Sequence, residues 1–258
     1  MGKVFVFTIL SALSLWCPKG VSRKAVDLNK NRFRISTIVD KKDFNPRGQQ
    51  GGRIGFLPFF FPMNIAYNID CIEYMRTLPD KAFDLAIVDP PYGLKASGAG
   101  ITGGKKCIRA LNTMPMEWDI PPTDEYFAEL FRVSKNQIIC GGNYFNLPPC
   151  RCFVVWDKRQ PWKNFSACEY LWTSFNAPAK LFSHLFRQKR IHPTQKPVAL
   201  YEYLIKTFAK QGDKILDTHL GSGSSRIAAY NLGFDFVGCE INKEFYDKQQ
   251  ERFINECR

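Results

Sequence analysis

The sequence lacks the features that build a disulfide scaffold or a structural metal site. Its 258 residues contain nine cysteines and three histidines, and the cysteines are scattered without any Cys-x-x-Cys spacing. This pattern argues against a disulfide framework and against a structural zinc ion. We interpret the cysteines as ordinary thiols of a reducing compartment, and we predict a cytoplasmic protein with no bound metal.

A long hydrophobic run is also missing. The apolar residues 4–16 follow Lys3 and resemble a secretory signal or a short anchor. The run is shorter than the roughly 20 apolar residues of a transmembrane helix, and no clean small-x-small cleavage site follows it. We therefore predict no membrane partner.

The charge of the chain is positive but unevenly distributed. The formal net charge is +12, yet residues 1–62 hold 11 lysines and arginines against three acids, and residues 63–258 hold 25 against 21. A basic excess favours a partner that carries phosphate. Because the excess belongs largely to residues 1–62, we interpret that segment as an extension, disordered or not part of a functional protein that starts at Met63. A basic arm that helps to hold DNA is the alternative.

From Met63 onward, the patterns expected of strands and helices alternate, and no internal repeat is visible. Strands are expected over residues 83–88, 137–140, 152–156, 170–175, 214–218 and 234–239. Helices are expected over residues 71–78, 123–133, 197–210, 224–232 and 243–255. Such alternation predicts an α/β domain of Rossmann-like class, with a mostly parallel sheet and helices on both faces.

The first segment that indicates chemistry is Asp89-Pro90-Pro91-Tyr92, directly after the buried strand 83–88. In open α/β sheets, ligands bind at the carboxyl ends of strands. The carboxylate of Asp89 and the carbonyl of Pro90 can accept the hydrogens of an amine that attacks a methyl sulfonium, and the two prolines stiffen the turn. Tyr92 can stack on a base that has left the duplex. A plain turn is the alternative, because Asp-Pro commonly opens turns.

The second segment is a Gly-rich loop between a strand and a helix, from Asp217 to Ser224. Glu240 ends the next strand, 19 residues after Gly221, where a carboxylate can bind the ribose hydroxyls of a nucleotide-like cofactor. Arg226 stands where a dinucleotide-binding loop has its third glycine. The loop therefore fits S-adenosylmethionine, which has an adenosine but no phosphate, better than it fits a dinucleotide.

A third segment, His-Pro-Thr-Gln-Lys-Pro at residues 192–197, precedes a helix and by itself is a helix entry. The three segments in this order resemble the DNA amino-methyltransferases, which make N6-methyladenine and N4-methylcytosine. Residues 89–92 match the family's (D/N/S)PP(Y/F) motif, residues 217–223 match its cofactor loop, and residues 192–197 match HPTQKP. The order resembles the circularly permuted β group. It implies a seven-stranded methyltransferase sheet over residues 63–258, with S-adenosylmethionine as cofactor.

The resemblance also implies roles for individual residues. Asp89, Pro90, Pro91 and Tyr92 would hold the target base and assist the transfer. The residues expected at the cofactor are Asp70, Thr194, Lys196, Asp217, Gly221, Ser222, Gly223 and Glu240. For Asp70, a helix N-cap is an equally good interpretation.

A region for target recognition is expected near residues 157–190, and it is short for this family. Basic residues expected to contact DNA are Lys105, Lys106, Lys158, Arg159, Arg187, Lys189 and Arg190. Nearby aromatic residues, among them Trp172 and Phe175, would suit base stacking. The alternative is a solvated basic face over ordinary core aromatics.

The predicted function is site-specific methylation of N6 of adenine in DNA, because Asp at position 89 favours adenine in this family and Ser favours cytosine. An N4-cytosine methyltransferase and a catalytically inactive DNA-binding relative are the alternatives. DNA is the expected partner, with a cognate restriction enzyme and a homodimer as further candidates.

Overall fold

The computed structural model describes residues 62–94, 119–161, 166–185 and 191–257. The interpretation of the N-terminal extension concerns residues that lie almost entirely outside these ranges. The same holds for five of the expected DNA contacts: Lys105, Lys106, Arg187, Lys189 and Arg190.

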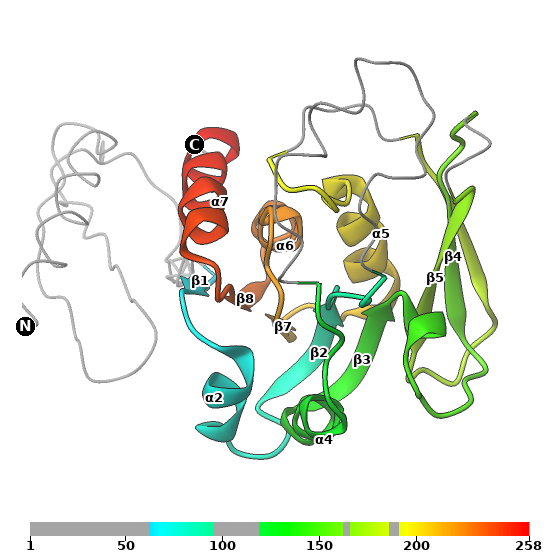
Figure 1. Cartoon of the computed structure of the whole chain (residues 1–258), viewed down its shortest axis with the longest axis horizontal. Coiled ribbons are helices and arrows are strands. Elements are labelled where there is room, and N and C mark those ends of the chain that lie inside the picture. The colour runs from blue at the N-terminus through cyan, green and yellow to red at the C-terminus, as the bar shows by residue number, and fades with distance from the viewer. Residues whose placement is uncertain (1–61, 95–118, 162–165, 186–190, 258) are drawn as a thin grey trace, which may run out of the picture. The chain divides into compact units, whose positions relative to one another are not determined.

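One mixed sheet of eight strands forms the centre of the described part of the chain (Figure 1). The strands are β1 (Asn64–Tyr67), β2 (Phe83–Val88), β3 (Ser134–Cys140), β4 (Phe153–Asp157), β5 (Cys168–Thr173), β6 (Lys180–Ser183), β7 (Lys214–Asp217) and β8 (Asp235–Cys239). Their order across the sheet is β1-β8-β7-β2-β3-β5-β4-β6. Strands β1, β8, β7, β2 and β3 run parallel to one another, β5 is antiparallel to both β3 and β4, and β6 is parallel to β4.

The predicted α/β class with a mostly parallel sheet is confirmed, with eight strands in place of the expected seven. The sequence analysis did not predict β1 and β6, each of which has only four residues. Among the described residues, no helix combines the length and the apolar character needed to cross a bilayer.

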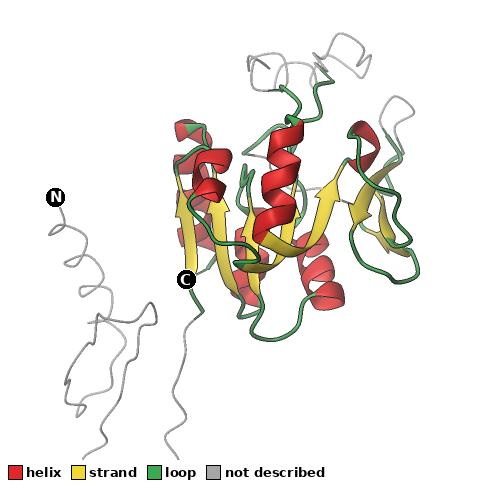
Figure 2. Cartoon of the chain, turned by 90° about the horizontal axis from the view of Figure 1, so that it is seen from below, coloured by secondary structure: helices red, strands yellow, loops and turns green. Residues whose placement is uncertain are grey.

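Helices cover both faces of the sheet, as Figure 1 and the turned view in Figure 2 show. Their bounds are α2 (Cys71–Arg76), α4 (Asp124–Val133), α5 (Val198–Phe208), α6 (Ser224–Asn231) and α7 (Lys243–Glu256), with a short 3-10 turn η5 (Gly142–Tyr144) after β3. In Figure 1, α5, α6 and α7 lie on one side of the sheet and α2 and α4 on the other. Every helix expected from the sequence is present, with ends that differ by one or two residues.

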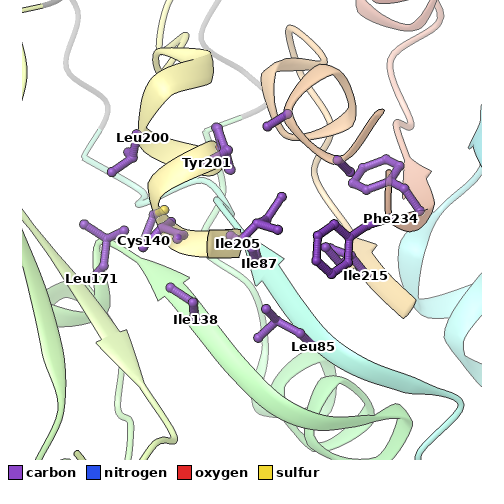
Figure 3. Close-up of a cluster of buried hydrophobic side chains, with 14 of the residues drawn as sticks. Leu85, Ile87, Ile138, Cys140, Leu171, Leu200, Tyr201, Ile205, Ile215 and Phe234 are labelled. Carbon is purple, nitrogen blue, oxygen red and sulfur yellow. The ribbon is translucent and has the colours of Figure 1, made fainter. Parts of the chain in front are cut away.

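The sequence of β2 is an almost continuous apolar run because the strand is buried on both of its faces. Leu85 and Ile87 point into the core beneath α5 and α6, where Figure 3 shows Ile87 beside Ile205. The alternate residues Ala86 and Val88 belong to the second core, beneath α2 and α4. Because successive side chains point to opposite faces and both faces are covered, all four must be apolar.

The pairing of β2 with β7 brings two of the three sequence segments together. Leu85 lies beside Ile215 and Ala86 beside Leu216 in parallel register. The turn that follows β2 and the Gly-rich loop that follows β7 therefore leave the same edge of the sheet next to each other. This edge is where ligands bind in open α/β sheets.

Candidate active site

A cavity of about 250 Å³ lies at the carboxyl edge of β2, β7 and β8. Its walls come from all three sequence segments. Lining residues that the sequence analysis had singled out are Asp89, Pro90, Pro91, Tyr92, His192, Thr194, Lys196, Gly221, Ser222 and Glu240. Segments about 100 residues apart in the chain thus form one site.

The side chains of Asp89, Tyr92 and Lys196 form a closed polar cluster in this cavity. The Tyr92 hydroxyl donates to Oδ1 of Asp89 at 2.7 Å. Nζ of Lys196 lies 2.5 Å from Oδ2 of Asp89 and donates to the Tyr92 hydroxyl at 3.1 Å. Burial by itself would lower the pKa of Lys196, but the carboxylates of Asp89 and Glu169 raise it well above its ordinary value. Lys196 was predicted at the cofactor, and the structure places its ammonium group against Asp89 and Tyr92.

The ring of Tyr92 is held by contacts that the sequence analysis did not identify. It stacks on Tyr144 with centroids 4.9 Å apart and packs edge-on against Phe145. Gly141, which follows β3 with φ +65°, lies beneath the same ring, and a Cβ there would stand 2.4 Å from Cε1 of Tyr92. Position 141 therefore requires glycine both for its backbone angle and for the space that the ring occupies.

Glu240 organises the Gly-rich loop. Its Oε2 accepts from the backbone N–H of Gly221 and its Oε1 from that of Asn242, both at 2.8 Å. Burial raises the pKa of this carboxyl above its ordinary value. Each carboxylate oxygen keeps a further lone pair, so Glu240 can accept ribose hydroxyls while it holds the loop. Gly221 has φ +50°, a left-handed angle that glycine adopts readily. Because glycine has no side chain, its backbone itself faces the cavity.

Three of the residues expected at the cofactor do not line the cavity. Asp70 caps α2 by accepting from the N–H groups of Ile72 and Glu73, which is the alternative interpretation of that residue. Asp217 lies below the loop, where it accepts from Ser225 Oγ at 2.5 Å and from the His219 N–H at 3.0 Å. Gly223 provides the left-handed turn, with φ +76°, that begins α6.

Two histidines line the cavity as neutral rings. Burial lowers the pKa of both His192 and His219 to about 4. The ring of His192 packs against Phe245 at 4.2 Å, and Nδ1 of His192 lies 3.1 Å from the Thr194 hydroxyl. A cationic cofactor such as a sulfonium therefore meets no added positive charge from these two rings.

The described part of the proposed DNA surface is mixed. Arg159 is exposed, with φ +49°, whereas Lys158 donates to Glu169 at 2.8 Å. Trp172 is buried and donates to the carbonyl of Pro148 at 2.7 Å. Phe175 stacks on Phe208 of α5. These two aromatic residues belong to the packing of the domain, as the alternative interpretation proposed.

The residues of the described ranges contain no group of three or more acids, histidines or cysteines that could hold a metal ion. The parallel sheet, the Asp-Pro-Pro-Tyr turn and the Gly-rich loop with its acidic partner together resemble the amino-methyltransferases.

Comparison with known proteins agrees with this class. Residues 152–251 match the family model of the N6/N4 DNA methylases. The type II methyltransferase M2.MboI of Moraxella bovis is 26% identical over 252 residues, covering 76% of this chain and 90% of the relative. M.HinfI of Haemophilus influenzae is 24% identical over 254 residues, covering 74% of this chain and 68% of the relative.

A solved structure with the same fold is that of PvuII DNA methyltransferase, described as cytosine-N4-specific. It has a TM-score of 0.51 at 12% identity, covering 73% of this chain and 85% of that one. These matches support the DNA amino-methyltransferase family for this chain. The methyl donor of this family is S-adenosylmethionine, in agreement with the cofactor expected from the loop.

Proposed function

We propose that the chain methylates N6 of adenine in DNA, with S-adenosylmethionine as the donor. The observation that carries the proposal is the meeting of Asp89 and Glu240 in one cavity. One carboxylate follows the stiff Pro-Pro turn and faces the space for an amine. The other holds the Gly-rich loop and faces the space for a nucleoside.

Residues around the loop fit the cofactor. Gly221 and Ser222 bring backbone to the cavity wall, and Glu240 stands beside them with only 8% of its surface exposed. A carboxylate in that place suits the two hydroxyls of a ribose. When bound, S-adenosylmethionine supplies an electrophilic methyl group on a sulfonium.

The work of Asp89 is to accept hydrogens from the amine of the base. Tyr92 and Lys196 use two of the roughly four acceptor positions of its carboxylate, which leaves two for the amine. Holding the amino hydrogens turns the nitrogen lone pair out of the base ring and toward the methyl group. Transfer would form the N–C bond and break the bond between the methyl group and sulfur, leaving the donor as a neutral thioether. The nitrogen would gain the positive charge and give up one proton, for which Asp89 supplies an acceptor.

Tyr92 provides a ring surface on which an extruded base can stack. The Asp at position 89 supports adenine over cytosine, because the family resemblance associates Ser with cytosine. A cognate restriction enzyme and a homodimer stay predictions for this chain.

The test is to incubate protein with unmethylated DNA and S-adenosylmethionine, digest the DNA to nucleosides, and identify the methylated base by mass. Asp89→Ala is the inactive control, and Asp84→Asn is the matched control. Asp84 lies at the other end of β2, where it pairs with Lys135 at 2.6 Å. N6-methyladenine that is lost only with Asp89→Ala supports the proposal. N4-methylcytosine would assign the other base, and no product from folded, cofactor-binding protein would indicate an inactive relative.

A further inference from the structure

Glu169 of β5 is a buried carboxylate beside the site, and the reaction described above does not use it. Its Oε1 accepts from Lys158 Nζ at 2.8 Å. Its Oε2 lies 3.4 Å from Lys196 Nζ and, within the described residues, is a buried oxygen without a hydrogen bond. An acceptor in this condition costs free energy.

Four charged groups of alternating sign run from the surface to the reacting carboxylate. They are Lys158, Glu169, Lys196 and Asp89, joined at 2.8, 3.4 and 2.5 Å. Along the row the side chains are 24%, 20%, 3% and 13% exposed. Lys196 is thus the most deeply buried of the four, and electrostatic interactions are stronger in such surroundings.

Lys196 is held from two sides. Its ammonium group lies between the carboxylates of Asp89 and Glu169, and its backbone carbonyl accepts from Ser224 Oγ at 2.8 Å. Burial by itself would raise the pKa of Glu169, but Lys196 and Lys158 lower it, so Glu169 is a carboxylate anion at neutral pH. With two anions for one buried cation, the charge of Asp89 is not fully taken up by Lys196.

We propose that Glu169 is a positioning residue for methyl transfer, which holds Lys196 so that Asp89 keeps its orientation and its negative charge for the amine. The inference rests on the proposed function of this site. Without the Glu169 anion, Lys196 would pair with Asp89 alone. The carboxylate would then turn toward the lysine and become a poorer acceptor for the amino hydrogens.

The test compares Glu169→Gln with wild-type protein in steady-state methylation of DNA. Glutamine keeps the shape of the side chain and removes the charge. We expect kcat to fall roughly 10- to 100-fold, the loss typical of a misplaced reacting group, with the KM for S-adenosylmethionine within about twofold of wild type because Glu169 does not line the cavity. Glu169→Asp, which keeps the charge on a shorter side chain, should recover part of kcat.

The matched control is Asp84→Asn. Asp84 lies in β2, away from the cavity, and its carboxylate contacts Lys135 and the Lys214 N–H and none of the four charged groups. Its side chain is 26% exposed, against 20% for Glu169. The variant likewise removes one negative charge that faces a lysine, so wild-type kcat is expected. Thermal unfolding of each variant shows that it is folded.

Two results would overturn the proposal. One is a Glu169→Gln kcat equal to that of Asp84→Asn. The other is a rise in KM that matches the loss of kcat, which indicates general damage to the cavity. If Glu169→Gln does not fold, Glu169→Asp decides: a lowered kcat with unchanged KM supports the role, and an unchanged kcat overturns it. Failure of the proposed function is distinct, because wild type and Asp84→Asn would then both transfer no methyl group.

Discussion

Gly141→Ala separates the role of the Tyr92 ring from the stability of the fold. The new Cβ would lie 2.4 Å from Cε1 and 2.5 Å from Cζ of Tyr92, distances at which the ring must move. Because Tyr92 donates to Asp89 and accepts from Lys196, moving its ring also disturbs the acceptor of the amine. A shift of about 1 Å in such a group costs up to roughly 100-fold in rate.

The second effect of Gly141→Ala is backbone strain, and Gly233→Ala is the control for it. Gly233 has φ +72°, close to the +65° of Gly141, but no atom lies within 4 Å of a Cβ built there. A left-handed alanine costs about 1–2 kcal/mol, which lowers the Tm of a domain of this size by roughly 2–8 °C. Gly233→Ala should show only this loss.

The assay measures kcat for DNA methylation and the Tm of both variants. We expect both Tm values to fall, and kcat to fall about 10- to 100-fold in Gly141→Ala alone. If the two variants keep the same kcat, the Tyr92 ring does not need its observed position, and the reasoning is refuted.

Three further predictions concern the loop, the buried acid and the DNA surface. Glu240→Gln loses a charged acceptor of two N–H groups, so the Kd for S-adenosylmethionine, measured by calorimetry, should rise roughly 10- to 100-fold. Glu244 is exposed, and Glu244→Gln should leave this Kd unchanged. Equal Kd values for the two variants would contradict the loop assignment. Burial raises the pKa of Asp217 from its ordinary value of 3.8 to about 7. Between about pH 4 and 7, the folded state therefore keeps a proton that the unfolded state releases. The free energy of unfolding contributed by Asp217 should therefore decrease as pH rises through this window and be fully present only below it. Chemical denaturation across the window should show a steeper decline for wild type than for Asp217→Asn, and parallel curves would refute the raised pKa. Arg159→Ala should weaken DNA binding and reduce the magnitude of the salt dependence of its affinity, the slope of log K against log salt concentration, by about 1. Arg151→Ala, just before the start of β4, should leave this slope unchanged. Equal slopes for the two variants would remove Arg159 from the DNA surface.

The sequence was most informative where local patterns determine structure. The bounds expected for β2 agree with the structure, because its apolar run must fill two cores. Strand β1 was not predicted, since its four residues show no clear pattern and it forms by pairing with β8, 172 residues away. The short edge strand β6 likewise depends on β4.

The site residues that the sequence identified are likewise those that a local pattern marks. Asp89, Tyr92 and Glu240 were identified because each ends a predicted strand or follows it directly, and the structure places all three in the cavity. Glu169 and Gly141 were not identified, because their importance comes from contacts with Lys196 and Tyr92 that only the folded sheet creates. Glu169 and Lys196 are 27 residues apart, and no local pattern links them.

The central claim is that Asp89 acts on the amine and does not hold the cofactor. The most direct measurement loads wild-type protein and Asp89→Ala with S-adenosylmethionine, records the Kd of each, and then follows a single turnover on DNA. The account predicts a Kd within a few-fold of wild type and a transfer rate at least roughly 100-fold lower. Transfer at the wild-type rate, or a loss of cofactor affinity that accounts for the whole loss of rate, would contradict it.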